Sequence, residues 1–230
     1  MGDLPPGLTD LLAEALRGVD VESGCHVVQL FGGGGELTQA LVAFADRLIA
    51  VDRSEEKLQE NFRRWPGVET ATGTSEAIPL PDDSVDVVVV ADPLELSCAS
   101  EPYREIARVL KSGGALVVAK YGERWPEERD LLGDFEPLLV DRGRAGREDW
   151  RRGLEETGLF TTVLVTESDR DVDVGVDAFV ALVGSWGWIA DLPGEQRAAV
   201  LGAVRDLVGD RATVTVRYHI EVCAARAIGG

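Results

Sequence analysis

Four consecutive glycines occupy residues 32–35, between an apolar run and a segment with helical spacing. Glycine lets the backbone approach a ligand closely, and a helix that follows such a turn directs free N–H groups towards the ligand. Asp52 ends the next apolar run, 19 residues beyond Gly33. An acid at this distance can accept hydrogen bonds from the hydroxyls of a ribose. The pattern therefore predicts a site for an adenosine-type ligand; the alternative interpretation is a tight turn and an acid that caps a helix.

The elements that would position this turn alternate between strands and helices. Five segments predict strands, at residues 25–31, 47–52, 68–73, 85–92 and 115–121, and the first and fourth are apolar enough to be buried. Between them the apolar residues recur at helical spacing, and one predicted helix covers residues 101–114, with Gly113 and Gly114 as its stop. This alternation favours a doubly wound α/β sheet, mostly parallel, with helices on both faces.

After residue 121 the pattern predicts accessory helices and two more strands. The helices are expected at about residues 123–157 and 173–209, and the strands at about 159–167 and 212–223. Apolar and polar residues alternate in the last strand, which favours an antiparallel, edge-type strand with His219 on its solvated face. No repeat or linker interrupts the chain. We therefore expect a single domain over residues 1–230, with its core at residues 20–122.

The composition favours a folded protein that acts on a small molecule. The formal net charge is −18, from 23 basic and 41 acidic residues, so the chain would repel nucleic acid and anionic membranes. No apolar run reaches the roughly 20 residues that cross a bilayer, and no signal peptide is apparent. The three cysteines and two histidines lack the spacing of metal ligands. We expect a cytoplasmic protein with no metal and no nucleic-acid or membrane partner; the oligomeric state is left open.

Two segments carry a resemblance to a known family: "GTSEAIPLPDDSVDVVVVADPLEL" and "REIARVLKSGGALVVAKYG". They resemble the class I S-adenosylmethionine-dependent methyltransferases, in the small-molecule branch of methyltransferase type 11 that includes quinone-biosynthesis enzymes. The resemblance covers the five-strand half in register and continues more weakly to the last strand. It implies a Rossmann-like seven-stranded sheet with an antiparallel last strand, S-adenosylmethionine as cofactor and a small-molecule acceptor.

The same resemblance implies which residues border the cofactor. By their positions in the motifs these are Gly33, Gly35, Asp52, Arg53, Thr74, Ser75, Glu76, Ala91 and Asp92. The two glycines would approach the methionine and ribose parts, and Asp52 would bind the ribose hydroxyls. Arg53 and residues 74–76 would flank the adenine. Ala91 and Asp92 would lie beside the methionine part.

Three residues depart from the family's pattern, although the first two are still expected to border the cofactor. Gln29 replaces an acid that organises the ammonium group of the cofactor, so a charge-assisted contact worth about 1 kcal/mol is lost. Phe31 replaces the first glycine, at a cost of order 1 kcal/mol or more if its φ is positive. Glu95 takes the approximate place of a histidine.

Glu95 and Asp92 are the candidate bases, needed only if the acceptor must lose a proton on attack. The alternative interpretations are an acid at a helix start for Glu95 and an acid at the cofactor edge for Asp92.

The sequence predicts a methyltransferase that modifies a small organic molecule at O, N or C, in natural-product metabolism. One alternative keeps the fold but loses methyl transfer in favour of another reaction, such as a cyclisation. A second alternative is a binding protein without catalysis. The retention of Asp52 together with the motif segments counts against this second alternative.

Overall fold

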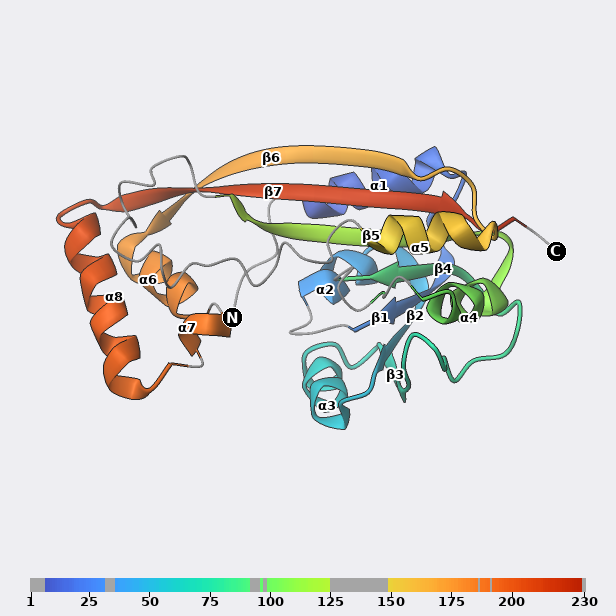
Figure 1. Ribbon diagram of the computed structural model, residues 1–230, viewed down its shortest axis with the longest axis horizontal. Helices are drawn as coiled ribbons and strands as arrows, with labels where there is room; N and C mark the ends of the chain where they lie inside the picture. The colour runs from blue at the N-terminus through green and yellow to red at the C-terminus, as the bar shows by residue number, and fades with distance from the viewer. Residues whose placement is uncertain are drawn as a thin grey trace. The chain divides into compact units, whose positions relative to one another are not determined.

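Seven strands form one sheet. They are β1 (Cys25–Leu30), β2 (Ala45–Asp52), β3 (Glu69–Thr72), β4 (Val85–Val90), β5 (Leu110–Arg124), β6 (Leu164–Gly175) and β7 (Thr213–Arg226). Their order is β3-β2-β1-β4-β5-β7-β6 (Figure 1). The computed structural model describes residues 7–31, 36–91, 96, 99–124, 149–185, 187–190 and 192–228. β1 pairs in parallel with β2 and β4, β2 with β3, and β4 with β5, which confirms the predicted α/β sheet.

β7 runs antiparallel to β5. Near the start of β5, the carbonyl of Gly114 accepts a 2.8 Å hydrogen bond from the N–H of Ala227, which directly follows β7. Further along β5, the ammonium of Lys120 lies 3.8 Å from a carboxylate oxygen of Glu221. From the first pair to the second, the residue number rises along β5 and falls along β7. The predicted antiparallel direction of the last strand is therefore confirmed.

The expectation of an edge-type last strand with a solvated histidine is wrong. β7 lies between β5 and β6, and side chains pair across β6 and β7 at every second residue. These pairs are Thr215–Asp173, Arg217–Asp171 and His219–Asp169. The ring Nδ1 of His219 lies 2.8 Å from Oδ1 of Asp169, and its side chain is only 16% exposed.

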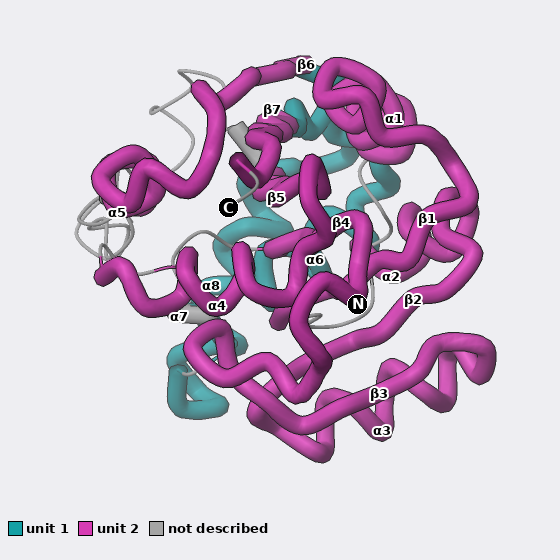
Figure 2. The backbone as a smooth tube through the Cα atoms, turned by 90° about the vertical axis from the view of Figure 1, so that its right-hand side faces the viewer, with its two compact units in different colours: residues 1–3, 122–140, 169–219 teal, residues 4–121, 141–168, 220–230 magenta. Residues whose placement is uncertain are grey.

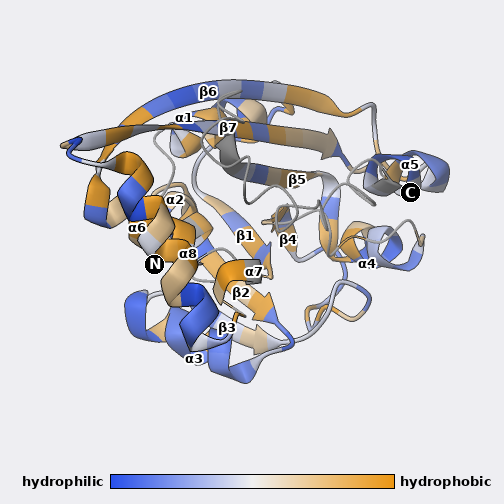
Figure 3. Cartoon of the chain, turned by 60° about the vertical axis from the view of Figure 1, so that its left-hand side comes forward, coloured by the Kyte–Doolittle hydropathy of each residue, from blue (hydrophilic) through white to orange (hydrophobic). Residues whose placement is uncertain are grey.

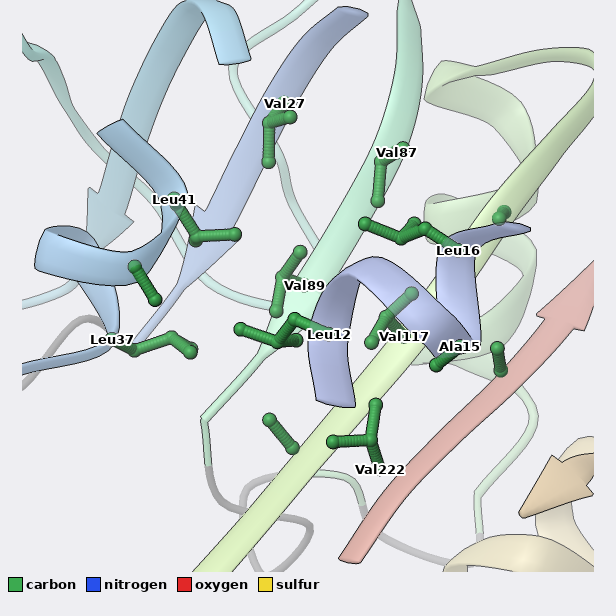
Figure 4. Packing of buried hydrophobic residues seen from close by; sticks show 14 of the residues in the cluster. Leu12, Ala15, Leu16, Val27, Leu37, Leu41, Val87, Val89, Val117 and Val222 are labelled. Atoms are coloured by element: carbon green, nitrogen blue, oxygen red, sulfur yellow. The ribbon is translucent and has the colours of Figure 1, made fainter. Parts of the chain in front are cut away.

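Helices cover both faces of the parallel part of the sheet. These helices are α1 (Leu8–Gly18), α2 (Glu36–Val42), α3 (Glu55–Arg64), α4 (Glu101–Val109) and α5 (Asp149–Thr157). Three further helices follow along the chain: α6 (Val176–Ser185), α7 (Gly187–Ala190) and α8 (Gly194–Val208). Val27, Val87 and Val89 point to one face and pack against leucines of α1 and α2, including Leu12 and Leu41 (Figure 4).

The opposite face of the same strands is also buried. It carries Val28 and Val88, which belong to a second apolar cluster with Tyr103 of α4 and Leu154 of α5. Strands covered on both faces are nearly continuous apolar runs, as in the sequence of β4.

The boundary between α4 and β5 differs from the prediction. The helix ends at Val109 and the strand begins at Leu110, so Gly113 and Gly114 do not stop the helix. Leu110 is buried and already aligns with Val85 of β4, and the register then shifts before the next pair. Gly113 has a φ of 76°, so the glycine accommodates an irregular turn of the backbone inside the strand.

The bounds of the later elements differ as well. The sixth strand, expected at about residues 159–167, spans Leu164–Gly175. Its second half is rich in aspartate: Asp171 and Asp173 alternate with Val172 and Val174, and cross-strand pairs join the aspartates to β7. The helix expected after residue 122 has α5 as its described part, since residues 125–148 lie outside the described ranges.

Contacts divide the chain into two compact units (Figure 2). One holds residues 1–3, 122–140 and 169–219, and the other holds residues 4–121, 141–168 and 220–230. Within the first unit, α6 and α8 pack against each other through an apolar cluster that includes Phe179, Val183 and Val204. The division does not test the expected single domain, which stays a prediction. None of the helices in the described ranges is long and apolar enough to span a membrane.

Candidate functional site

The carboxyl ends of β1, β2 and β4 meet at one edge of the sheet. Leu30 aligns with Val51 of β2 on one side and with Val90 of β4 on the other. The residues that follow these three positions are Phe31, Asp52 and Ala91. Crevices beyond the carboxyl ends of parallel strands are the usual ligand sites of open α/β sheets. The structure therefore brings three of the predicted site residues together.

Phe31 begins the turn in the backbone conformation of a glycine. Its φ is 58°, in the left-handed region that a residue with a side chain adopts at a cost of about 1–2 kcal/mol. The ring is partly buried against the second apolar cluster. Phe31 therefore adopts a positive φ, which is the costlier of the two conformations considered from the sequence.

Asp52 uses one carboxylate oxygen locally, and the other has no partner among the residues that the structure describes. The residue is 3% exposed, and its Oδ1 accepts a 2.8 Å hydrogen bond from the N–H of Ser54. Ser54 is the N-cap of α3, and its hydroxyl accepts a 3.3 Å hydrogen bond from the N–H of Lys57. No described residue donates a hydrogen bond to Oδ2 of Asp52. The helix thus has its own cap, and Oδ2 remains able to accept a hydrogen bond from a ligand.

The turn at residues 73–77 is tied to Asp52 through the backbone. The N–H of Gly73 donates a 3.1 Å hydrogen bond to the carbonyl of Asp52, and Thr74 and Ala77 form an antiparallel bridge. Ser75 is buried, at 1% exposure, whereas Glu76 is exposed. The predicted adenine-flanking residues therefore lie on a turn directly connected to the predicted ribose-binding acid.

Gln29 is part of a buried polar chain that the sequence did not reveal. The hydroxyl of Thr38 in α2 donates a 2.8 Å hydrogen bond to Oε1 of Gln29, and Nδ2 of Asn61 in α3 donates a 3.0 Å hydrogen bond to the same hydroxyl. Asn61 is 3% exposed, although most of α3 is hydrophilic (Figure 3). An asparagine at a buried position of such a helix was the available signal.

Arg108 of α4 fixes the loop between the predicted adenine turn and β4. Its guanidinium donates hydrogen bonds to Glu105, to Asp82 at 2.6 Å and to the carbonyl oxygens of Ile78 and Leu80. Glu105 also accepts a 2.8 Å hydrogen bond from the N–H of Ile78. Arg108 thereby holds the pKa of the Glu105 carboxyl below its usual range. This network joins the segments "AIPLPDD" and "REIARVL", and their spacing in the sequence does not reveal it.

Four predicted site residues lie outside the part of the chain that the structure describes: Gly33, Gly35, Asp92 and Glu95. Arg53 is described and exposed. The predicted cofactor contacts and the two candidate bases therefore stay predictions.

Comparisons with known proteins agree with this geometry. The family model described as "Methyltransferase domain" matches residues 30–118. An uncharacterized methyltransferase of Mycobacterium tuberculosis is 32% identical over 183 residues, which cover 80% of this chain and 73% of the relative.

Two solved structures share the fold at 23% identity. A putative type II methyltransferase from Anaeromyxobacter dehalogenans has a TM-score of 0.71 and covers 98% of this chain and 97% of its own. The cyclase SpnF has a TM-score of 0.55 and covers 97% of this chain and 80% of its own.

Proposed function

Because the chain belongs to the class I S-adenosylmethionine-dependent methyltransferase family, we propose that it transfers a methyl group from S-adenosylmethionine to a small organic acceptor. The observation that carries the proposal is the pair formed by Phe31 and Asp52 at the carboxyl ends of neighbouring strands. Phe31 has a left-handed backbone at the position of the family's first glycine, and one carboxylate oxygen of Asp52 has no partner among the described residues. A strained backbone is retained where the surrounding structure and a function require it.

The residues at this edge fit the cofactor. Oδ2 of Asp52 would accept hydrogen bonds from the ribose hydroxyls, and the turn at residues 74–76 with Arg53 would flank the adenine. Gln29, Phe31, Gly33 and Gly35 would border the ribose and amino-acid end, with Ala91 and Asp92 beside the methionine part. The cofactor supplies a methyl group on a positively charged sulfur.

The chain's own contribution to methyl transfer is positioning and exclusion of water. Asp92 or Glu95 would accept a proton if the acceptor must lose one. The net charge of −18 favours a small organic acceptor over nucleic acid or an anionic membrane. A cytoplasmic location and a place in natural-product metabolism complete the proposal.

The test is calorimetric titration with S-adenosylmethionine and with S-adenosylhomocysteine. The Asp52→Asn variant should bind both at least tenfold more weakly, because its amide can still accept the Ser54 hydrogen bond but turns a donor towards the ribose. Asp46→Asn is the matched control, since Asp46 is exposed at the other end of β2. Absence of binding to the unmodified protein contradicts the proposal.

A second candidate function is a different reaction, such as a cyclisation, in the same fold. The observations that favour it are Gln29 and Phe31, which replace two residues of the cofactor turn. The fold of SpnF, named a cyclase, is compatible with this candidate but assigns no reaction to this chain. Tight binding of S-adenosylmethionine with no methyl turnover across a panel of acceptors would favour it.

A further inference from the structure

Three neutral polar side chains form a buried hydrogen-bonded chain beside the turn after β1. Gln29 and Thr38 are 0% exposed and Asn61 is 3% exposed. Asn61 donates to the hydroxyl of Thr38 at 3.0 Å, and Thr38 donates to Oε1 of Gln29 at 2.8 Å. The chain connects β1, α2 and α3 through side chains alone.

Both ends of this buried chain lack partners. Nε2 of Gln29 and Oδ1 of Asn61 form no hydrogen bond with any residue that the structure describes. A buried polar atom without a partner is destabilising, and native structures rarely keep one without a reason. Gln29 lies two residues before Phe31, where the candidate cofactor turn begins. Its free end is therefore suited to a ligand that completes the hydrogen bonding.

The direction of hydrogen-bond donation along these three side chains decides whether Gln29 offers a donor or an acceptor to that ligand. In the observed direction Oε1 is occupied by Thr38, and the free end of the amide is a donor. In the reverse direction Nε2 of Gln29 donates to Thr38, Thr38 donates to Oδ1 of Asn61, and the free end of Gln29 is an acceptor. Both directions contain two hydrogen bonds among the three side chains. One added hydrogen bond from a ligand is enough to select between them.

We infer that Thr38 and Asn61 are positioning residues that hold the Gln29 amide in the direction that the amino-acid end of the cofactor selects. This inference rests on the proposed function. The ammonium group of the cofactor is a donor, so its binding selects the reverse direction, in which Oε1 of Gln29 is free. A neutral amide thereby takes the place of a carboxylate, with two further side chains holding it in the accepting orientation.

The experiment compares two ligands by calorimetric titration. S-Adenosylhomocysteine carries the amino-acid end, and 5′-methylthioadenosine has the same adenosyl and sulfur groups without it. The dissociation constant of 5′-methylthioadenosine divided by that of S-adenosylhomocysteine gives a ratio that isolates the contribution of the amino-acid end. A larger ratio means a stronger contribution. Thr38→Val removes the hydroxyl and should lower this ratio about tenfold, whereas Thr38→Ser keeps the hydroxyl and the ratio. If the valine variant does not fold, Thr38→Ala replaces it.

Asn61→Asp tests the direction itself. A carboxylate at this position only accepts, so it fixes the reverse direction and should raise the ratio. Its negative charge could also attract the ammonium directly, and the double variant Thr38→Val with Asn61→Asp separates the two causes. The increase disappears in the double variant if it is transmitted through Thr38, and persists if it is direct attraction.

The outcomes distinguish this inference from the proposed function. Binding of both ligands with the same ratio in the unmodified protein and the Thr38→Val variant overturns the inference and leaves the proposed function standing. Persistence of the Asn61→Asp increase in the double variant overturns it as well. Binding of neither ligand to the unmodified protein overturns both.

Discussion

The N–H of Phe31 donates a 2.9 Å hydrogen bond to the carbonyl of Val51, so the first residue of the turn is fixed to the residue before Asp52. This bond holds the two halves of the candidate cofactor site at a set distance across β1 and β2. It also holds Phe31 at a φ of 58°, where a residue with a side chain is strained. The site therefore contains a local strain that substitution can measure.

Substitution of Phe31 by glycine and by alanine should separate the ring from the backbone strain. Both changes remove the ring and its packing, but only glycine relieves the positive φ. We expect the free energy of unfolding of Phe31→Gly to exceed that of Phe31→Ala by about 1 kcal/mol. Urea unfolding measures the difference. Equal stability of the two variants would show that the turn relaxes to a negative φ once the ring is gone.

Substitution of Gln29 by glutamate should strengthen binding of the amino-acid end in a pH-dependent manner. Thr38 would donate to one carboxylate oxygen and leave the other for the ammonium group, a charge-assisted contact worth about tenfold in affinity. Burial raises the pKa of such a carboxyl, so the gain should be present at high pH and decline as the carboxylate is protonated.

Titration of the Gln29→Glu variant with S-adenosylhomocysteine measures this dependence. The titration covers about pH 6 to pH 9, the range in which the raised pKa of a buried carboxyl is expected. Binding of 5′-methylthioadenosine serves as the control and should not gain. A gain of equal size for both ligands would contradict the assignment of Gln29 to the amino-acid end.

Loss of the Glu105 carboxylate should destabilise the loop before β4. Glu105→Gln removes charge-assisted hydrogen bonds to Arg108, with an expected loss of about 1–3 kcal/mol in the free energy of unfolding at neutral pH. The side chain of Glu105 is 17% exposed, so water replaces little of the contact. Glu69→Gln is the matched control, because the Arg47–Glu69 pair lies on the surface and contributes little.

The Glu105 effect should depend on pH with a definite sign. Hydrogen bonds from Arg108 lower the pKa of Glu105 below its ordinary value of 4.5. Its stabilisation is therefore present above about that pH and is lost as the pH falls through the lowered pKa. The difference in stability between the unmodified protein and Glu105→Gln should shrink in acid. A difference that stays constant to low pH would contradict the role of the ionised carboxylate.

Cys25 should make the protein less stable in alkaline solution. Burial raises the pKa of its thiol from 9.0 to about 11, with the nearby Asp86 carboxylate adding to the effect. The unfolded chain loses this proton first, so the contribution of Cys25 is intact below pH 9.0 and is lost as the pH rises towards about 11. Urea unfolding of the unmodified protein and Cys25→Ala should show a smaller decline in the variant. Parallel declines would rule the thiol out as the cause.

The parallel half of the fold was predictable mainly because β1, β4 and the second half of β2 are buried on both faces and their sequences are largely apolar. Asp52 was predictable for a related reason: it ends such a strand. The end of α4 was not, because Gly113 and Gly114 look like a helix stop whereas buried Leu110 has already joined the sheet. β6 was only half predicted, because the aspartates of its second half mask the alternation with Val172 and Val174 and pair with residues of β7 that are distant in the sequence.

The polar chain at Gln29 could not be predicted from spacing. Thr38 and Asn61 are 23 residues apart and lie on different helices, and they meet because both helices pack against β2, the neighbour of β1. A residue-by-residue comparison with a family pattern shows that Gln29 replaces an acid, but it does not show what supports the amide. The candidate bases Asp92 and Glu95 remain predictions from the motif alone.

The aspartates of β6 have a consequence for how copies of the protein meet in solution. β6 is the last strand of the sheet in the described ranges, so its outer edge pairs with no further strand there. Asp169, Asp171 and Asp173 place negative charge at every second residue of this edge. A second copy adding edge to edge would bring these carboxylates close together, and since, among the described residues, only Asp171 is hydrogen-bonded to an arginine of β7, we expect strand-by-strand association to be disfavoured at neutral pH. Near the isoelectric point of about 4.5 the net repulsion between copies vanishes, so colloidal stability should be lowest in mild acid.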